Sequence, residues 1–332
     1  KFTSDLSKWN VSNVTSISRL FLNTTSFNSD LSRWNTAKVH NASSAFKNAT
    51  SFSNNDLSCW NVARVRSSEE FLLGAGANNT PPRWNDNTTC LANTPMNPSE
   101  IFQITVTGTS FGFLNNLSDS VYAYNYDVDC DTNGRRDYIG QTGGTICVYD
   151  TNGPHTLSIV GTLPSFQADQ NSVTKIRTIE KWGNNAWKEL SDTFAEATNL
   201  TGIADDAGVP NLTQASSLHS MFYKATNFDA NLSAWDVSNV SVLRHMFNGA
   251  TSFNSDISKW DVSNVAWMDG LFAGASSFNS DVSSWNTANV LGMSSVFNNA
   301  SSFTGNDLSC WDVSSVTLYD NFSQGWGSNN IP

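Results

Sequence analysis

The chain has 332 residues, a formal net charge of −11 and 39% hydrophobic residues, and only 14% of its residues are charged. A chain this acidic repels polyanions, which argues against nucleic acids and anionic lipid surfaces as partners. No apolar run approaches the roughly 20 residues that a membrane-spanning helix needs. Asn, Ser and Thr are abundant in place of charged residues, which is typical of an extracellular surface.

Residues 1–75 hold about three copies of a 25-residue repeat, which begin at Phe2, Phe27 and Phe52. The repeat is clearest in residues 252–300, where one pattern occurs twice at a spacing of 25 residues. A fixed period of this size predicts stacked repeats that complete each other's interior. We therefore expect a mixed α/β solenoid, similar to a leucine-rich repeat, in which Phe, Trp, Leu and Val form continuous internal columns.

Each repeat has two halves. The first alternates apolar and polar residues, as around Leu31 and Trp34, which predicts a short extended segment. The second has apolar residues at steps of three and four, as in Val240, Leu243 and Phe247, which predicts one or two helical turns. An aspartate recurs in the first half and is interpreted as a turn or cap residue, with a metal-binding column as the alternative. These aspartates are Asp256, Asp281 and Asp307.

The repeats stop after residue 75, and residues 76–99 form an Asn- and Pro-rich linker. Residues 100–181 show short β-like runs separated by turn residues such as Gly143-Gly144 and Asn152-Gly153-Pro154. The five runs are 101–107, 121–128, 137–140, 145–149 and 155–160. Strands at this spacing predict a small all-β sandwich of the Ig or PKD type.

Residues 182–332 return to the repeat pattern after an irregular cap. The cap contains Trp182, Trp187, Phe194 and Leu200. The regular repeats that follow begin at Phe228, Phe253, Phe278 and Phe303.

A longer period relates the two ends of the chain. Phe2 and Phe253 are 251 residues apart, and so are Trp9 and Trp260. Residues 1–81 and 252–332 are therefore two copies of one segment, identical at about half of their positions. We interpret the chain as a window on a larger tandem array in which solenoid and sandwich alternate.

The five cysteines follow the same 251-residue offset, because Cys310 is the copy of Cys59. We pair Cys59 with Cys90 and Cys130 with Cys147, and the predicted partner of Cys310 would lie beyond Pro332. The alternative is reduced, buried thiols. Disulfides persist in oxidising compartments, so this pairing favours an extracellular location.

The repeat motif resembles that of BspA-like leucine-rich-repeat surface proteins, also called the Mycoplasma-type lipoprotein repeat of about 25 residues. Residues 256–265 and 237–250 match it closely, and residues 178–183 resemble the segment that precedes such repeats. Residues 124–147 are more loosely similar to the β-rich modules that accompany them. The resemblance implies a cell-surface or secreted protein with adhesive or structural roles and no enzymatic activity.

One acidic segment is a candidate calcium site. Asp-x-Asp-x-Asn-Gly from Asp129 to Gly134 matches the start of a calcium-binding loop, but the closing Glu is replaced by Gly140, and two arginines lie inside the segment. The alternative is a hairpin turn flanked by solvated carboxylates. The candidate ligands are Asp127, Asp129, Asp131, Asn133 and Asp137. We expect no other cofactor.

Many Asn-x-Ser/Thr sequons occur, and in a secreted eukaryotic protein they would accept covalent N-glycans. The alternative is chance, because the chain is rich in all three residue types. The candidates are Asn23, Asn41, Asn48, Asn78, Asn87, Asn116, Asn199, Asn211, Asn231, Asn299 and Asn321.

No nucleophile elbow, phosphate-binding loop or paired metal-ligand motif is present in the sequence. We therefore expect a non-enzymatic extracellular structural protein, the repeating subunit of a glycosylated filament or surface appendage, whose partners are copies of itself arranged end to end. The alternative is a cell-surface adhesin that binds a protein or glycan.

Overall fold

A computed structural model describes residues 2–82, 84, 96–113, 122–132, 136–304, 306–322 and 324. It divides into two compact units, Lys1–Pro95 with Gly134–Ile139 and Met96–Asn133 with Gly140–Pro332. The regular elements that it describes are η2 (Pro98–Glu100), β1 (Phe102–Phe113), β2 (Asn125–Asp129), β3 (Tyr138–Gln141), β4 (Thr145–Thr162), η3 (Val173–Lys175), β5 (Ile176–Lys181) and β6 (Gly202–Ile203).

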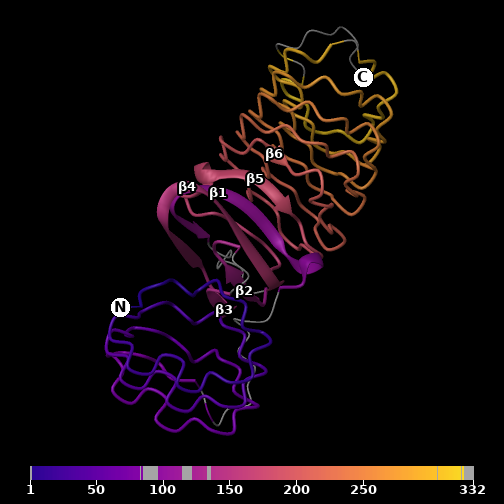
Figure 1. Ribbon diagram of the computed structural model, residues 1–332. Helices are drawn as coiled ribbons and strands as arrows, with labels where there is room; N and C mark the ends of the chain where they lie inside the picture. The colour runs from indigo at the N-terminus through magenta and orange to yellow at the C-terminus, as the bar shows by residue number, and fades with distance from the viewer. Residues whose placement is uncertain are drawn as a thin grey trace. The chain divides into compact units, whose positions relative to one another are not determined.

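The strands form one open mixed sheet in the order β3-β2-β4-β1-β5-β6 (Figure 1). Strand β1 is antiparallel to both β4 and β5, and β5 is parallel to β6. The predicted two-sheet sandwich is therefore wrong. Aromatic residues take the place of a second sheet, since Phe166 and Trp187 pack edge-on against Phe102 of β1, with ring centroids 5.0 and 5.1 Å away.

Strand β4 also corrects the turn that we predicted at Asn152-Gly153-Pro154. The strand runs without a break through these residues, and Gly153 pairs with Gly108 of β1. The pairing shifts register between Gly108 and Ser110, where one residue of β1 lies opposite residues 149–152 of β4, so the extra residues bulge from β4. Gly108 has a φ of +109°, which residues with a side chain rarely adopt.

The repeats lie in two sets, which we call the N-terminal stack (residues 2–82) and the C-terminal stack (residues 186–322). The described residues contain no α-helix, so the predicted α/β solenoid is wrong. Consecutive turns form the second half of each repeat, where the chain is drawn as a plain tube in Figure 1. Parallel bridges join one repeat to the next. In the C-terminal stack the bridges connect Ser217, Val242, Trp267, Gly292 and Leu318.

The backbone hydrogen bonds explain why this segment is not helical. From Leu243 to Gly249, every second N–H donates to a carbonyl of the next repeat at 2.7–3.0 Å. Between them, the N–H groups of Met246 and Asn248 close turns onto carbonyls three residues earlier. Left-handed backbone at His245 (φ 56°) and Gly249 (φ 73°) allows this alternation, whereas an α-helix needs φ near −63° throughout.

The predicted aromatic columns are present. Phe253, Phe278 and Phe303 stack in one line with centroids 5.8 and 5.6 Å apart. A second column contains Phe247 and Phe272, whose ring centroids lie 5.9 Å apart. Because each ring fills the gap between its neighbours, a repeat's interior is complete only when repeats cover both of its sides.

A column of tryptophans adds a hydrogen bond to the packing. The buried indole of Trp260 donates to the Leu232 carbonyl at 3.0 Å, and that of Trp285 donates to the Ile257 carbonyl at 3.1 Å. Each acceptor belongs to the preceding repeat. A tryptophan at this position therefore satisfies its own polar group, and it adds a second hydrogen bond to a carbonyl that already accepts a turn N–H.

Candidate functional site

The first repeat of the N-terminal stack and its copy 251 residues later have different surroundings. Phe2, Trp9 and Leu20 are 44%, 61% and 51% exposed. Their copies 251 residues later, Phe253, Trp260 and Leu271, are 0%, 3% and 0% exposed. The copies are buried because the repeat at residues 228–250 packs over them. We call the uncovered side of the first repeat the open face.

The open face is an apolar hollow of about 360 Å³. Its lining includes Phe2, Trp9, Leu20 and Trp34. Exposure of apolar surface of this kind to water is unfavourable, and the free energy falls when another apolar surface covers it.

A row of backbone acceptors accompanies the hollow. In the covered copy, the carbonyls of Trp267, Asp269 and Leu271 accept N–H groups from the preceding repeat at 2.8–3.0 Å. The equivalent carbonyls of Ser16, Ser18 and Leu20 accept no backbone hydrogen bond from the described residues. The open face therefore has the hydrogen-bonding character of a sheet edge.

The acidic segment that we considered as a calcium site lies between β2 and β3. Asp129 and Asp131 belong to one compact unit, in which Asp129 Oδ1 accepts the Asp131 N–H at 3.3 Å, and Asp137 belongs to the other unit. Asp127 Oδ1 accepts the Gly140 N–H at 2.7 Å, while Asn133 lies outside the described residues. Calcium binding stays a prediction.

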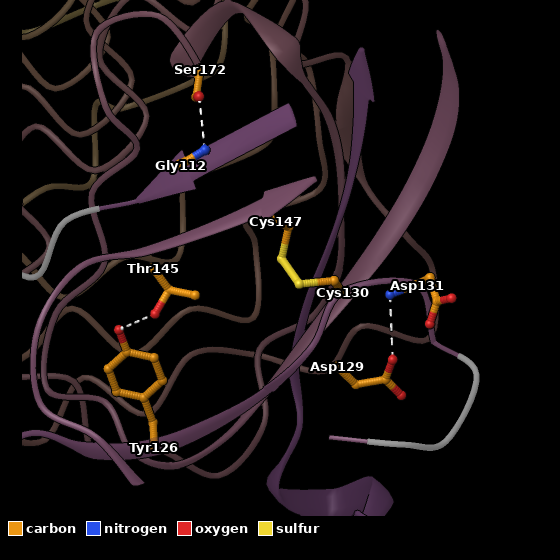
Figure 2. The surroundings of a disulfide bond; sticks show 8 residues. All are labelled: Gly112, Tyr126, Asp129, Cys130, Asp131, Thr145, Cys147 and Ser172. Atoms are coloured by element: carbon orange, nitrogen blue, oxygen red, sulfur yellow. Dashed lines mark hydrogen bonds between the residues drawn. A yellow bond between two sulfur atoms is a disulfide. The ribbon is translucent and has the colours of Figure 1, made fainter. Parts of the chain in front are cut away.

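A disulfide joins Cys130 to Cys147, as predicted, with a Cα–Cα distance of 5.6 Å (Figure 2). It ties the end of β2 to β4, beside the bond between the Tyr126 and Thr145 hydroxyls and the contact of Asp129 with the Asp131 N–H (Figure 2). Cys59 is disulfide-bonded, and its predicted partner Cys90 lies outside the described residues. Cys310 is an exposed free thiol.

The recurring aspartates cap turns, as the sequence predicted. Asp256, Asp281 and Asp307 each accept the backbone N–H of the serine two residues later at 3.0 Å. Hydrogen bonds from the hydroxyl and the backbone N–H of that serine lower the pKa of each carboxyl below its ordinary value. The carboxylates satisfy their own turns, which is the first of the two roles that we considered.

The predicted glycosylation sites differ in what their amide nitrogen does. Asn48 donates its Nδ2 to Asn23 Oδ1 at 3.0 Å, Asn78 to Asn54 Oδ1 at 3.1 Å and Asn199 to the Thr174 carbonyl at 2.7 Å. A glycan on these nitrogens would replace an N–H donor. Six candidates are exposed, namely Asn23, Asn48, Asn78, Asn231, Asn299 and Asn321. Asn41, Asn199 and Asn211 are half-buried, and Asn87 and Asn116 lie outside the described residues.

Sequence reasoning did not identify two features of the structure. The first is the open face, which the 251-residue offset between Trp9 and Trp260 could have indicated. The second is a cluster on the C-terminal stack, where the Arg244 guanidinium lies 4.2 Å from the centroid of the Trp267 ring and its Nε donates to Asp269 at 2.7 Å. Beside it, burial lowers the pKa of His245.

A family model described as "Mycoplasma protein of unknown function, DUF285" matches residues 1–84, 164–253 and 216–330. The match overturns our identification of the chain as a BspA-like leucine-rich-repeat protein. No curated protein and no solved structure matches the chain. No helix within the described ranges is long and apolar enough to span a membrane.

Proposed function

The chain belongs to the DUF285 family, and we propose that it is a non-enzymatic extracellular structural protein, the repeating subunit of a glycosylated filament or surface appendage. The observation that carries the proposal is that neighbouring repeats complete each other's interior. Phe253, Phe278 and Phe303 stack in one line, with ring centroids 5.8 and 5.6 Å apart. An end-to-end assembly of subunits can extend the same contacts from one subunit to the next.

The interactions between neighbouring repeats support a structural role. Rings, indole N–H groups and every second backbone N–H from Leu243 to Gly249 find their partners in a neighbouring repeat. The stability of such an array grows with each added interface. Extending the array across subunits uses the same interactions that hold each subunit together.

Chemical features of the surface support an extracellular location and glycan attachment. The Cys130–Cys147 disulfide suits an oxidising compartment. Six of the candidate sequon asparagines are exposed. A surface poor in charge and rich in amides and hydroxyls gains hydration from attached glycans.

Electron microscopy and sedimentation velocity of the purified glycoprotein test this function. We expect elongated oligomers whose length grows with concentration, with a regular axial repeat. Particles that remain single subunits up to about 100 μM, well above the Kd of a specific assembly contact, would refute the proposal. Peptide mapping after glycosidase treatment tests the glycan part, and we expect modification at Asn231 and Asn299.

A further inference from the structure

We infer that a polar hollow at the end of β4 binds a short saccharide that carries a carboxylate. The hollow has a volume of about 380 Å³, and its lining includes Asn184, Asn185, Lys188 and Gln214. All of its described lining residues lie between Ala123 and Gln214, within one compact unit. A binding site here goes beyond the proposed structural role.

The polar side chains that line the hollow are not used by the protein itself. Among the described residues, the amide groups of Asn184, Asn185 and Gln214 form no hydrogen bond, and Lys188 forms no ion pair. Amides in the regular repeats are used internally, as where Asn264 donates to the carbonyl of Ser238 at 2.7 Å. The hollow therefore gathers polar groups that are available to a ligand.

The backbone around the hollow is held in place before any ligand arrives. The Trp187 N–H donates to the Asn211 carbonyl at 3.1 Å, and the Lys188 N–H donates to the Pro164 carbonyl at 2.9 Å. These bonds join the segment that carries the amides to the repeat that follows and to the chain after β4. A fixed backbone lowers the entropy that binding must otherwise cost.

Two close contacts hold the walls further. A Cβ atom on Gly183 would lie 2.8 Å from the Glu100 carbonyl oxygen, so the turn before Asn184 packs tightly against η2. The hydroxyls of Tyr124 and Ser165 are 2.7 Å apart and buried, which fixes the chain next to the lining residue Ala123. The hollow is therefore a feature of the folded unit.

The chemistry of the lining favours a saccharide. A primary amide both donates and accepts hydrogen bonds, which is what neighbouring sugar hydroxyls require. The size of the hollow is at the lower end of the range for small-molecule sites and suits a mono- or disaccharide. Among the described residues that line it there is no carboxylate, imidazole or thiolate, the side chains that hold metal ions most strongly.

Lys188 favours a sugar that carries a carboxylate. Its ammonium group is the one charged group among the described lining residues, and a charge-assisted hydrogen bond to a carboxylate is stronger than one to a hydroxyl. The Lys188 Nζ lies 5.6 Å from the centroid of the Tyr122 ring, beside the lining residue Ala123. An aromatic ring at this place offers a surface for the apolar face of a sugar ring.

A glycan array tests the inference on the purified full chain after glycosidase treatment. The array carries neutral saccharides, the corresponding uronic acids, and the glycans released from this chain. We expect carboxylated saccharides to bind at least about 10-fold more tightly than their neutral counterparts. Binding to the released glycans would identify this chain as the source of the ligand, and binding to the other saccharides alone would identify a foreign source.

Matched substitutions locate the binding in the hollow. Gln214→Ala should weaken it at least about 10-fold, whereas Gln170→Ala should leave it unchanged. Gln170 is also exposed and without a side-chain hydrogen bond in the described residues, but it lies outside the lining. Lys188→Gln should remove the preference for a carboxylate while neutral saccharides still bind. Circular dichroism confirms that the variants fold.

Three results would overturn the inference. They are an array without binding above background, equal binding of carboxylated and neutral saccharides, and binding that Gln214→Ala leaves unchanged or that Gln170→Ala weakens as much. The array reads binding by a single chain, so its outcome is separate from that of the assembly experiments.

Discussion

Replacing Phe253 by Ala should cost far more stability than replacing its copy Phe2 by Ala. Phe253 is fully buried and stacks on Phe247 at 3.8 Å, on Phe278 at 5.8 Å and on Phe228 at 6.3 Å. Phe2 is nearly half exposed, and within the described ranges its ring stacks on Phe27 alone, with centroids 5.5 Å apart.

The expected losses follow from these environments. Truncating a fully buried Phe costs about 3–5 kcal/mol, because the transfer free energy is lost and a cavity remains. Truncating Phe2 should cost about 1–2 kcal/mol, because much of its ring is already in water and no closed cavity forms.

Guanidinium unfolding measures both variants, each from the transition of its own unit. Submicromolar protein keeps self-association from covering Phe2. Equal losses in the two variants would show that the burial of a ring between repeats does not hold the stack together, and the argument for end-to-end assembly would fail with it.

Three further outcomes test separate features. Trp285→Phe should destabilise the C-terminal stack by about 0.5–1.5 kcal/mol because one of the two hydrogen bonds to the Ile257 carbonyl is lost, and an unchanged unfolding midpoint would contradict this. Removing the Cys130–Cys147 bridge, which closes a 17-residue separation, should cost about 3 kcal/mol by denaturant titration, while Cys310→Ser serves as the neutral control. The pKa values of the capping aspartates are lowered in the folded state. Their contribution to the free energy of unfolding is therefore complete above the unfolded pKa of about 3.9, and it is lost as the pH falls through the lower folded values. Asp256→Asn keeps the acceptor without the ionisation and should reduce this acid sensitivity in unfolding measured from pH 5 to 2; an unchanged pH profile would speak against it.

Local residue chemistry predicted part of the structure well. The spacing of Phe253, Phe278 and Phe303 was enough to predict a column, because rings at one position of successive repeats must share one interior. Cys130 and Cys147 were paired correctly because strand-like runs contain or border both residues.

Other predictions failed because the deciding partner lies elsewhere in the chain. Steps of three and four residues from Val240 to Phe247 fit a helix and a series of turns equally well. The turns form because every second N–H in this segment is taken by the next repeat. The sandwich prediction failed in the same way, since Phe166 and Trp187 cover the sheet from outside the predicted strands.

The sequence by itself determined the period, the residues that would be interior, the capped turns and the 251-residue relation between the two ends. These follow from side-chain polarity and from identity at fixed spacing. Only the tertiary structure decided that the repeats are turns, that one sheet forms instead of two, and that Trp9 is exposed while Trp260 is buried. Each of these depends on which backbone or ring packs against a given residue. Identical residues such as Trp9 and Trp260 have different neighbours at the two places in the chain.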